Sequence, residues 1–125
     1  MMQFKELSET EMEIMQYLWR RDSPIATADI LSYFNNEKQK DWKTQTISTF
    51  LARLVTKGFV ISEAKGRGTI HSAAITIREY DRLKAKSILK SMYKGSIKNF
   101  LVALYGDNKI SNKELAELKQ WLSER

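Results

Sequence analysis

Residues 42–76 decide the fold of this chain, and they read WKTQTISTFLARLVTKGFVISEAKGRGTIHSAAIT. In the first half, apolar residues recur at spacings of three and four, as on one face of an α-helix: Ile47, Phe50, Leu51, Leu54 and Val55. Thr44 is expected to cap this helix, and Gly58 is expected to end it in a left-handed conformation. The second half contains two short apolar runs around a glycine-rich turn, which predicts a β-hairpin.

The face opposite the apolar residues carries short hydrogen-bonding side chains and no acidic residue. Gln45, Thr49, Ala52 and Thr56 are expected there, with Ser48 and Arg53 on its flanks. Short polar side chains suit a surface that must approach the edges of DNA bases closely. A plain amphipathic helix with a threonine-rich face would show the same pattern, so the helix alone leaves both interpretations open.

The expected hairpin favours DNA binding. The runs 59–62 and 69–72 flank Lys65-Gly66-Arg67-Gly68, a turn whose two glycines are able to adopt positive φ. A basic turn by itself is often only solvated. Two cations at such a tip, directly after a helix of this kind, are better explained as contacts to phosphate. The order helix, strand, basic turn, strand is the second half of a winged helix-turn-helix.

Composition narrows the possible functions. The 125 residues can bury one modest core, or a compact domain with an oligomerisation appendage. Without cysteine there are no disulfides, thiolate metal sites or cysteine nucleophiles, and the single histidine, His71, is expected to be structural or to contact a ligand from the hairpin. The sequence shows no phosphate-binding glycine loop and no spaced metal ligands, so we expect no enzyme, no cofactor and no metal. The lack of a long apolar run or a cleavable signal predicts a soluble, cytoplasmic protein.

Charge is distributed unevenly along the chain. The net charge is +6, but residues 1–37 hold three basic and seven acidic side chains. Residues 38–75 hold seven basic and two acidic side chains, and residues 76–125 hold eleven and six. The positive charge begins just ahead of the expected recognition helix, as the electrostatic footprint of a nucleic-acid-binding surface should.

Three capping boxes, each bracketed by an apolar pair, predict the starts of further helices. They pair Ser8 with Glu11, Thr76 with Glu79 and Ser111 with Glu114. The first helix should run to about Arg21, and Pro24 should break the chain after it. Thr27 is expected to cap a short second helix over 28–34. Helix, helix, helix and hairpin complete a winged-helix domain over residues 1–75.

Residues 76–125 are expected to form three helices, at about 77–94, at 97–105 and after Ser111. The run 100–105 is apolar on every side, which predicts burial all round. Short helices with this much apolar surface and no core of their own require a partner, and a symmetric homodimer is the commonest solution. The alternative is that they only cover the winged-helix core. The residues expected at the dimer interface are Ile88, Met92, Phe100, Leu101, Leu104, Leu118, Trp121 and Leu122.

The chain resembles the penicillinase-repressor family (the BlaI/MecI/CopY group of bacterial winged-helix repressors) over nearly its whole length. The matching residues are 7–13 with Trp19, Trp42, Thr46-Ile47 with Thr49, Arg53-Leu54, Lys57-Gly58-Phe59, the basic hairpin and Tyr93-Lys94-Gly95. The resemblance implies a mainly α (α+β) fold, with a winged helix-turn-helix DNA-binding domain over 1–75 and a three-helix dimerisation domain over 76–125. It also implies a homodimeric repressor on a palindromic DNA operator that controls a resistance or stress operon of the β-lactam type.

Further expectations follow from the family position by position. Its base contacts come from the start of the recognition helix, where members often carry cations at the positions of Gln45 and Ser48. The expected DNA-binding residues are Thr44, Gln45, Thr46, Ser48, Thr49, Arg53, Lys65 and Arg67. In the antibiotic-resistance branch a sensor-activated protease cuts an Asn–Phe bond, which corresponds here to Ala103–Leu104 as the possible proteolytic site. The copper-responsive branch carries a C-terminal cysteine cluster, which this chain lacks.

The sequence argues against two other functions. A winged helix used only for protein–protein docking should show an acidic or apolar recognition face, and the expected face is neither. RNA binding should show an exposed aromatic platform, and the sequence identifies none.

Overall fold

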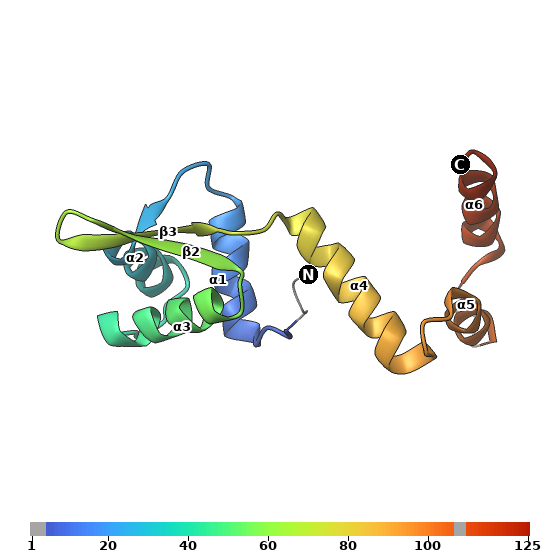
Figure 1. The fold of residues 1–125 in the computed structure, drawn as a ribbon, viewed down its shortest axis with the longest axis horizontal. Helices are drawn as coiled ribbons and strands as arrows, with labels where there is room; N and C mark the ends of the chain where they lie inside the picture. Colours follow the sequence, from blue (N-terminus) through green and yellow to red (C-terminus); the bar gives the residue numbers. More distant parts are fainter. Residues whose placement is uncertain (1–4, 107–109) are drawn as a thin grey trace. The chain divides into compact units, whose positions relative to one another are not determined.

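The structure, a computed structural model, describes residues 5–106 and 110–125, without the side chains of Met92 and Tyr93. The chain forms two compact units, residues 1–82 and residues 83–125. The elements, shown in Figure 1, are α1 (Glu9–Trp19), β1 (Ile25–Ala26), α2 (Thr27–Glu37), α3 (Thr44–Thr56), β2 (Val60–Lys65), β3 (Gly68–Ala73), α4 (Ile77–Tyr93), α5 (Ile97–Gly106) and α6 (Asn112–Ser123). Apart from β1, the order from α1 to β3 is the winged helix-turn-helix order predicted from the sequence.

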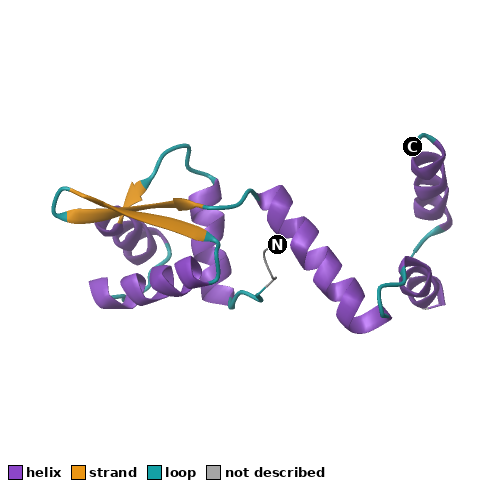
Figure 2. Cartoon of the chain, viewed as in Figure 1, coloured by secondary structure: helices purple, strands orange, loops and turns teal. Residues whose placement is uncertain are grey.

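The first unit contains a three-stranded antiparallel sheet in the order β1-β3-β2 (Figure 2). β2 and β3 pair from Val60 opposite Ala73 to Lys65 opposite Gly68, so both strands reach further into the basic turn than expected. β1, which the sequence analysis missed, pairs Ile25 with His71 and Ala26 with Ile70. The short third strand ties the segment before α2 to the hairpin.

The predicted capping boxes of α1 and α4 are present. Glu11 N donates to Ser8 Oγ at 3.1 Å, and Ser8 N donates to a carboxylate oxygen of Glu11 at 2.8 Å. Thr76 and Glu79 make the equivalent pair at 3.0 and 3.1 Å. The expected caps of the other two helices of the first unit are wrong. Lys43 precedes α3 and Ala26 precedes α2, neither with a side-chain cap bond, so Thr44 and Thr27 are the first helical residues.

A single apolar core holds the first unit together. Its members, all less than one-tenth exposed, are Ile14, Met15, Tyr17, Leu18, Ile25, Ile30, Phe34, Ile47, Leu51, Leu54, Phe59, Val60, Ile75 and Tyr80. Gly58 has a φ of 88°, the left-handed conformation predicted for the end of α3. Val55 was expected in the buried face of α3, but its side chain is 41% exposed because, at 100° per residue, it lies at the edge of the face that Ile47, Leu51 and Leu54 bury.

A side chain closes the turn between α2 and α3. Asn35 accepts a hydrogen bond from Trp42 N and donates one to Trp42 O, both at 2.9 Å. The Trp42 ring lies between the rings of Phe34 and Phe50, at 5.0 and 5.5 Å between centroids. These contacts determine where α3 begins relative to α2.

The first turn of α4 is part of the first unit. Tyr80 is 4% exposed and packs against Trp19 and Phe59, at 5.6 and 5.8 Å between ring centroids. Trp19 Nε1 donates to the carbonyl oxygen of Ile75 at 3.0 Å. The core of the first unit therefore extends past Ile75.

The second unit comprises the rest of α4 with α5 and α6. Ser96 and Ser111 cap α5 and α6, since each hydroxyl accepts a backbone N–H three residues on at 3.1 Å. Between Leu83 and Arg125, none of the described side chains is buried. The burial expected all round for 100–105 is therefore absent within one chain: Val102 is 60% exposed and Tyr105 56%.

Candidate nucleic-acid interface

The exposed face of α3 is the one predicted from the sequence. Gln45, Ser48, Thr49 and Arg53 are exposed, as is Thr44 at the start of the helix, whereas Thr46 is half-buried. On the opposite side the structure buries Ile47, Leu51 and Leu54. The buried face anchors the helix, which leaves the short polar side chains free to meet a ligand.

Two of these polar side chains are linked. Thr49 Oγ1 donates to the carbonyl oxygen of Gln45 at 2.9 Å. The hydroxyl hydrogen is then used within the helix, so Thr49 offers an accepting oxygen and a methyl group to a ligand. Gln45 keeps its side-chain amide for recognition, with two donors and one accepting oxygen.

Cations surround this face. A shallow depression of about 320 Å³ is lined by Lys43, Gln45, Thr46, Thr49, Phe50 and Arg53. A second, of about 430 Å³, is lined by Lys5, Thr49, Ala52, Arg53, Thr56 and Lys57. The helix has no acidic residue in its first turn, so the positive end of its dipole is not neutralised. Sequence reasoning identified Arg53 but missed Lys43, which directly precedes α3. It also missed Lys5 and Lys57, which the packing brings to the same surface.

The hairpin tip presents two cations. Lys65 and Arg67 are both exposed, on either side of Gly66. Gly66 has a φ of 61°, whereas Gly68 pairs as a strand residue, so only one of the two glycines adopts the positive φ of which both are capable. Figure 1 shows the tip projecting beyond α2 and α3, toward the same end of the unit as the N-terminus of α3. The two expected DNA-contacting elements therefore face the same end.

His71 is a structural residue of the sheet. Its side chain is 5% exposed, and its two ring nitrogens lie 2.6 Å from Ser62 Oγ and 2.7 Å from Thr27 Oγ1. Thr27 thus bonds the imidazole instead of capping α2. Burial lowers the pKa of His71 below its ordinary value of 6.5, which favours the neutral ring. The contacts of His71 with Ser62 and Thr27 join β2, β3 and the start of α2, and so support the hairpin.

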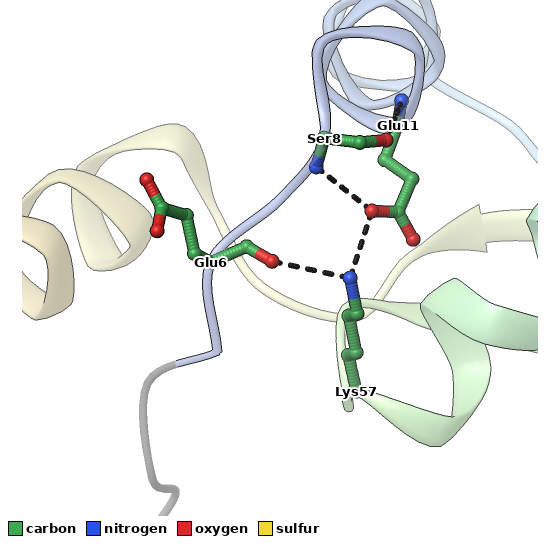
Figure 3. A network of polar contacts seen from close by, with 4 residues as sticks. All are labelled: Glu6, Ser8, Glu11 and Lys57. Carbon is green, nitrogen blue, oxygen red and sulfur yellow. Dashed lines mark hydrogen bonds and ion pairs between the residues drawn. The ribbon is translucent and has the colours of Figure 1, made fainter.

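A part-buried ion pair supports the other end of α3 (Figure 3). Lys57 Nζ lies 2.7 Å from a carboxylate oxygen of Glu11 and donates to the carbonyl oxygen of Glu6 at 3.1 Å. Burial alone would raise the pKa of Glu11, but hydrogen bonds from Lys57 and Ser8 outweigh it and hold the pKa below its ordinary value. The capping box of α1 and the C-terminal end of α3 therefore share one carboxylate, which the local sequence pattern did not reveal.

The residues expected at a dimer interface lie on the second unit with much of their surface uncovered. Ile88 is 40% exposed, Trp121 51% and Leu122 55%. The side chains of Phe100, Leu101, Leu104 and Leu118 are half-buried, and that of Met92 lies outside the described part of the chain. The prediction did not include Ile97 and Val102, which are 65% and 60% exposed.

The expected proteolytic site lies within a helix. Ala103 is exposed and Leu104 is half-buried, and both are inside α5. Proteases bind their substrates as extended chains, so cutting this bond requires α5 to unwind locally.

Three packed helices, an antiparallel hairpin and an exposed polar third helix beside a basic tip define a winged helix-turn-helix protein. Residues 7–124 match the penicillinase repressor family. The chain belongs to that family. Among the described residues, no helix is long and apolar enough to cross a membrane.

Individual relatives agree with this assignment. The chain is 28% identical to the penicillinase repressor of Bacillus licheniformis over 99% of its own length and 94% of the relative's. It is 24% identical to the methicillin resistance regulatory protein MecI of Staphylococcus aureus, over 96% and 95% of the two chains. A solution structure of the DNA binding domain of the repressor BlaI matches with a TM-score of 0.53 and 29% identity, over 64% of this chain and 94% of that one. The predicted family and fold class are confirmed.

Proposed function

We propose that this chain is a homodimeric transcriptional repressor that binds a palindromic DNA operator through α3 and the hairpin tip of each protomer. One observation carries the proposal: the exposed face of α3 has no acidic residue, and the start of α3 lies at the same end of the unit as the basic tip. Membership of a repressor family supports it, as does the similarity to the DNA binding domain of BlaI.

The proposed roles follow from side-chain chemistry. Gln45 pairs bidentately with adenine, Ser48 bonds base edges, and Thr49 places its methyl group against thymine. Thr44 and Thr46 contact the DNA at the start of the helix. Arg53, Lys65 and Arg67 contact phosphates, which position the protein without reading sequence.

Residues 83–125 are proposed to hold the dimer through their exposed apolar side chains. A two-fold dimer places two α3 helices on two half-sites, which is why the operator should be palindromic. The relatives' names connect them with penicillinase and methicillin resistance, so a resistance or stress operon is the proposed target. Release would follow an inducing signal, and a sensor-activated protease would have to unwind α5 to cut at Ala103–Leu104.

The proposal includes no catalytic step. Both ring nitrogens of His71 are occupied by hydroxyl groups, and the carboxylate of Glu11 is committed to a cap and an ion pair. The protein is proposed to act in the cytoplasm, where its DNA lies, without a cofactor.

The test is selection of bound duplexes from a random DNA pool with the full chain, combined with light scattering. We expect an enriched inverted repeat and a mass twice the 14.6 kDa of one chain. Enrichment of a single, non-repeated site by a monomer would contradict the dimeric arrangement. A failure to enrich any sequence would favour the protein-docking alternative.

Arg67→Ala separates positioning from base reading. It should weaken binding to all sequences about equally and flatten the dependence of affinity on salt. Ser123→Ala, at an exposed position on α6, is a control that should leave both unchanged. A changed sequence preference in the Arg67 variant would show that the tip reads bases.

A further inference from the structure

The surface of α4 carries a row of cations that the winged helix does not use. Arg78, Arg82, Lys86 and Lys90 follow one another at intervals of four residues, and all are exposed. Four residues advance an α-helix by about 6 Å and by slightly more than one turn, so these side chains form a gently curving stripe about 18 Å long. Lys84 points to the opposite side of the helix, since it is about 180° from the middle of the stripe at 100° per residue.

No ion pair in the described part of the chain involves this stripe. The ion pairs among the described residues join Glu13 to Lys40 and Glu11 to Lys57, so none involves α4. The acidic residues of α4 are Glu79 and Asp81, both near its start, and Glu79 accepts the hydrogen bond from Thr76 N. From Arg82 to Gly106 the sequence holds six cations and no acidic residue.

An unpaired stripe of this kind is unfavourable for a helix by itself. Like charges four residues apart repel one another and destabilise an isolated helix. A linear polyanion relieves that repulsion, and double-stranded DNA supplies about one negative charge per 1.7 Å of its axis. Glu79 and Asp81 lie beside Arg78 and Arg82, but Lys86 and Lys90 have no acidic residue within four positions along the helix. An evenly spaced row of cations matches a phosphate backbone better than a protein surface, which mixes both kinds of side chain.

We propose that Arg78, Arg82, Lys86 and Lys90 form a second phosphate-binding surface, which adds DNA backbone contacts to those of α3 and the hairpin tip. The inference rests on the proposed function, because it requires the protein to bind DNA. The row contributes affinity and salt dependence but no choice of sequence, since phosphates are common to every base pair.

The experiment compares two full-length triple variants with the wild type on the selected operator. One carries Arg82→Gln, Lys86→Gln and Lys90→Gln, and the other carries Lys84→Gln, Lys113→Gln and Lys119→Gln. Each removes three exposed charges per chain, the second outside the stripe. Affinity is measured over a series of salt concentrations, phosphates are mapped by ethylation interference, and light scattering reports the mass of each variant.

The stripe variant should lose roughly tenfold or more in affinity at low salt. The negative slope of log affinity against log salt concentration should become less steep by up to about 5, because each dimer loses six phosphate contacts. It should also lose sensitivity at phosphates where ethylation impairs the wild type, and its sequence preference should not change. Equal slopes in the two variants would overturn the inference, as would a stripe variant that becomes monomeric with an unchanged phosphate map. A wild-type chain that binds no DNA would instead overturn the proposed function, and the inference with it.

Discussion

The two units of this chain differ in how far they bury their apolar side chains. Every buried apolar side chain that the structure describes lies between Ile14 and Tyr80, in the unit formed by residues 1–82. Residues 83–125 leave Ile97, Val102, Tyr105, Trp121 and Leu122 at least half exposed. Exposed apolar patches of this kind mark surfaces that meet another molecule. The first unit therefore buries a core within one chain, whereas the second is the unit that we propose to bury its apolar surface against a partner.

Separating the units should have the largest effect. A chain ending after Arg82 keeps Tyr80 and the first core, so we expect a folded monomer. Its operator affinity should fall by about 10²- to 10⁴-fold, because two half-sites are no longer bound by one body. Circular dichroism reports whether the fragment is folded, light scattering gives its mass, and fluorescence anisotropy measures its operator affinity. An equally tight dimer of this fragment would show that the second unit does not hold the protomers together.

The same substitution in each unit tests where stability resides. Ile47→Ala removes a fully buried side chain and should lower the free energy of unfolding of the first unit by about 2–5 kcal/mol. Ile97→Ala changes a side chain that is 65% exposed in one chain, so it should leave that unit intact and raise the dimer dissociation constant. Thermal unfolding at several protein concentrations distinguishes the two outcomes. If the Ile97 variant lost stability equally at all protein concentrations, Ile97 would stabilise its own chain and not the dimer.

Within the first unit, the exposed face of α3 should affect recognition and not stability. Gln45→Ala should cost about 1–3 kcal/mol on the selected operator and far less on random DNA. Its free energy of unfolding should match the wild type, because Gln45 lies outside the core. Selection from random duplexes with this variant gives the readout. Unchanged sequence preference would move base reading to Thr46 and Ser48.

The smallest expected effect concerns acid. The pKa of His71 is lower in the folded chain than its ordinary value of 6.5, so the unfolded chain binds the proton more readily. The free energy of unfolding of the first unit should therefore fall as pH drops from above 6.5 toward the folded pKa. His71→Gln should flatten this dependence, as measured by urea unfolding at each pH. A wild type that becomes more stable over this window would contradict the assignment.

Sequence alone predicted most of the features that depend on neighbours along the chain, although the expected caps at Thr44 and Thr27 are wrong. The caps at Ser8, Thr76 and Ser111 are local patterns, and so are the left-handed Gly58 and the hairpin. The pairing of Ile25 with His71 was missed because two residues carry no periodicity. The sharing of Glu11 with Lys57 was missed because 46 residues separate the two side chains.

In the candidate site, too, local patterns revealed some residues and missed others. The exposed face of α3 follows from the 3.6-residue period, so Gln45, Ser48 and Arg53 were placed correctly on its surface. Lys43 at the start of α3 was overlooked because a threonine one residue later is the better cap by chemistry. The contribution of Lys5 depends on how the N-terminal segment packs beside α3, and no local pattern encodes that packing.

The paired hydrogen bonds between Asn35 and Trp42 have a consequence for how such a protein can change over generations. They close the turn before α3 through one side chain and one backbone unit, independently of the residues on the outward face of α3. The outward residues of α3 are likewise unnecessary for its anchoring. New combinations at those outward positions can therefore arise and be tried against new DNA sites while the scaffold stays intact, which lets duplicated copies of such a gene acquire separate targets.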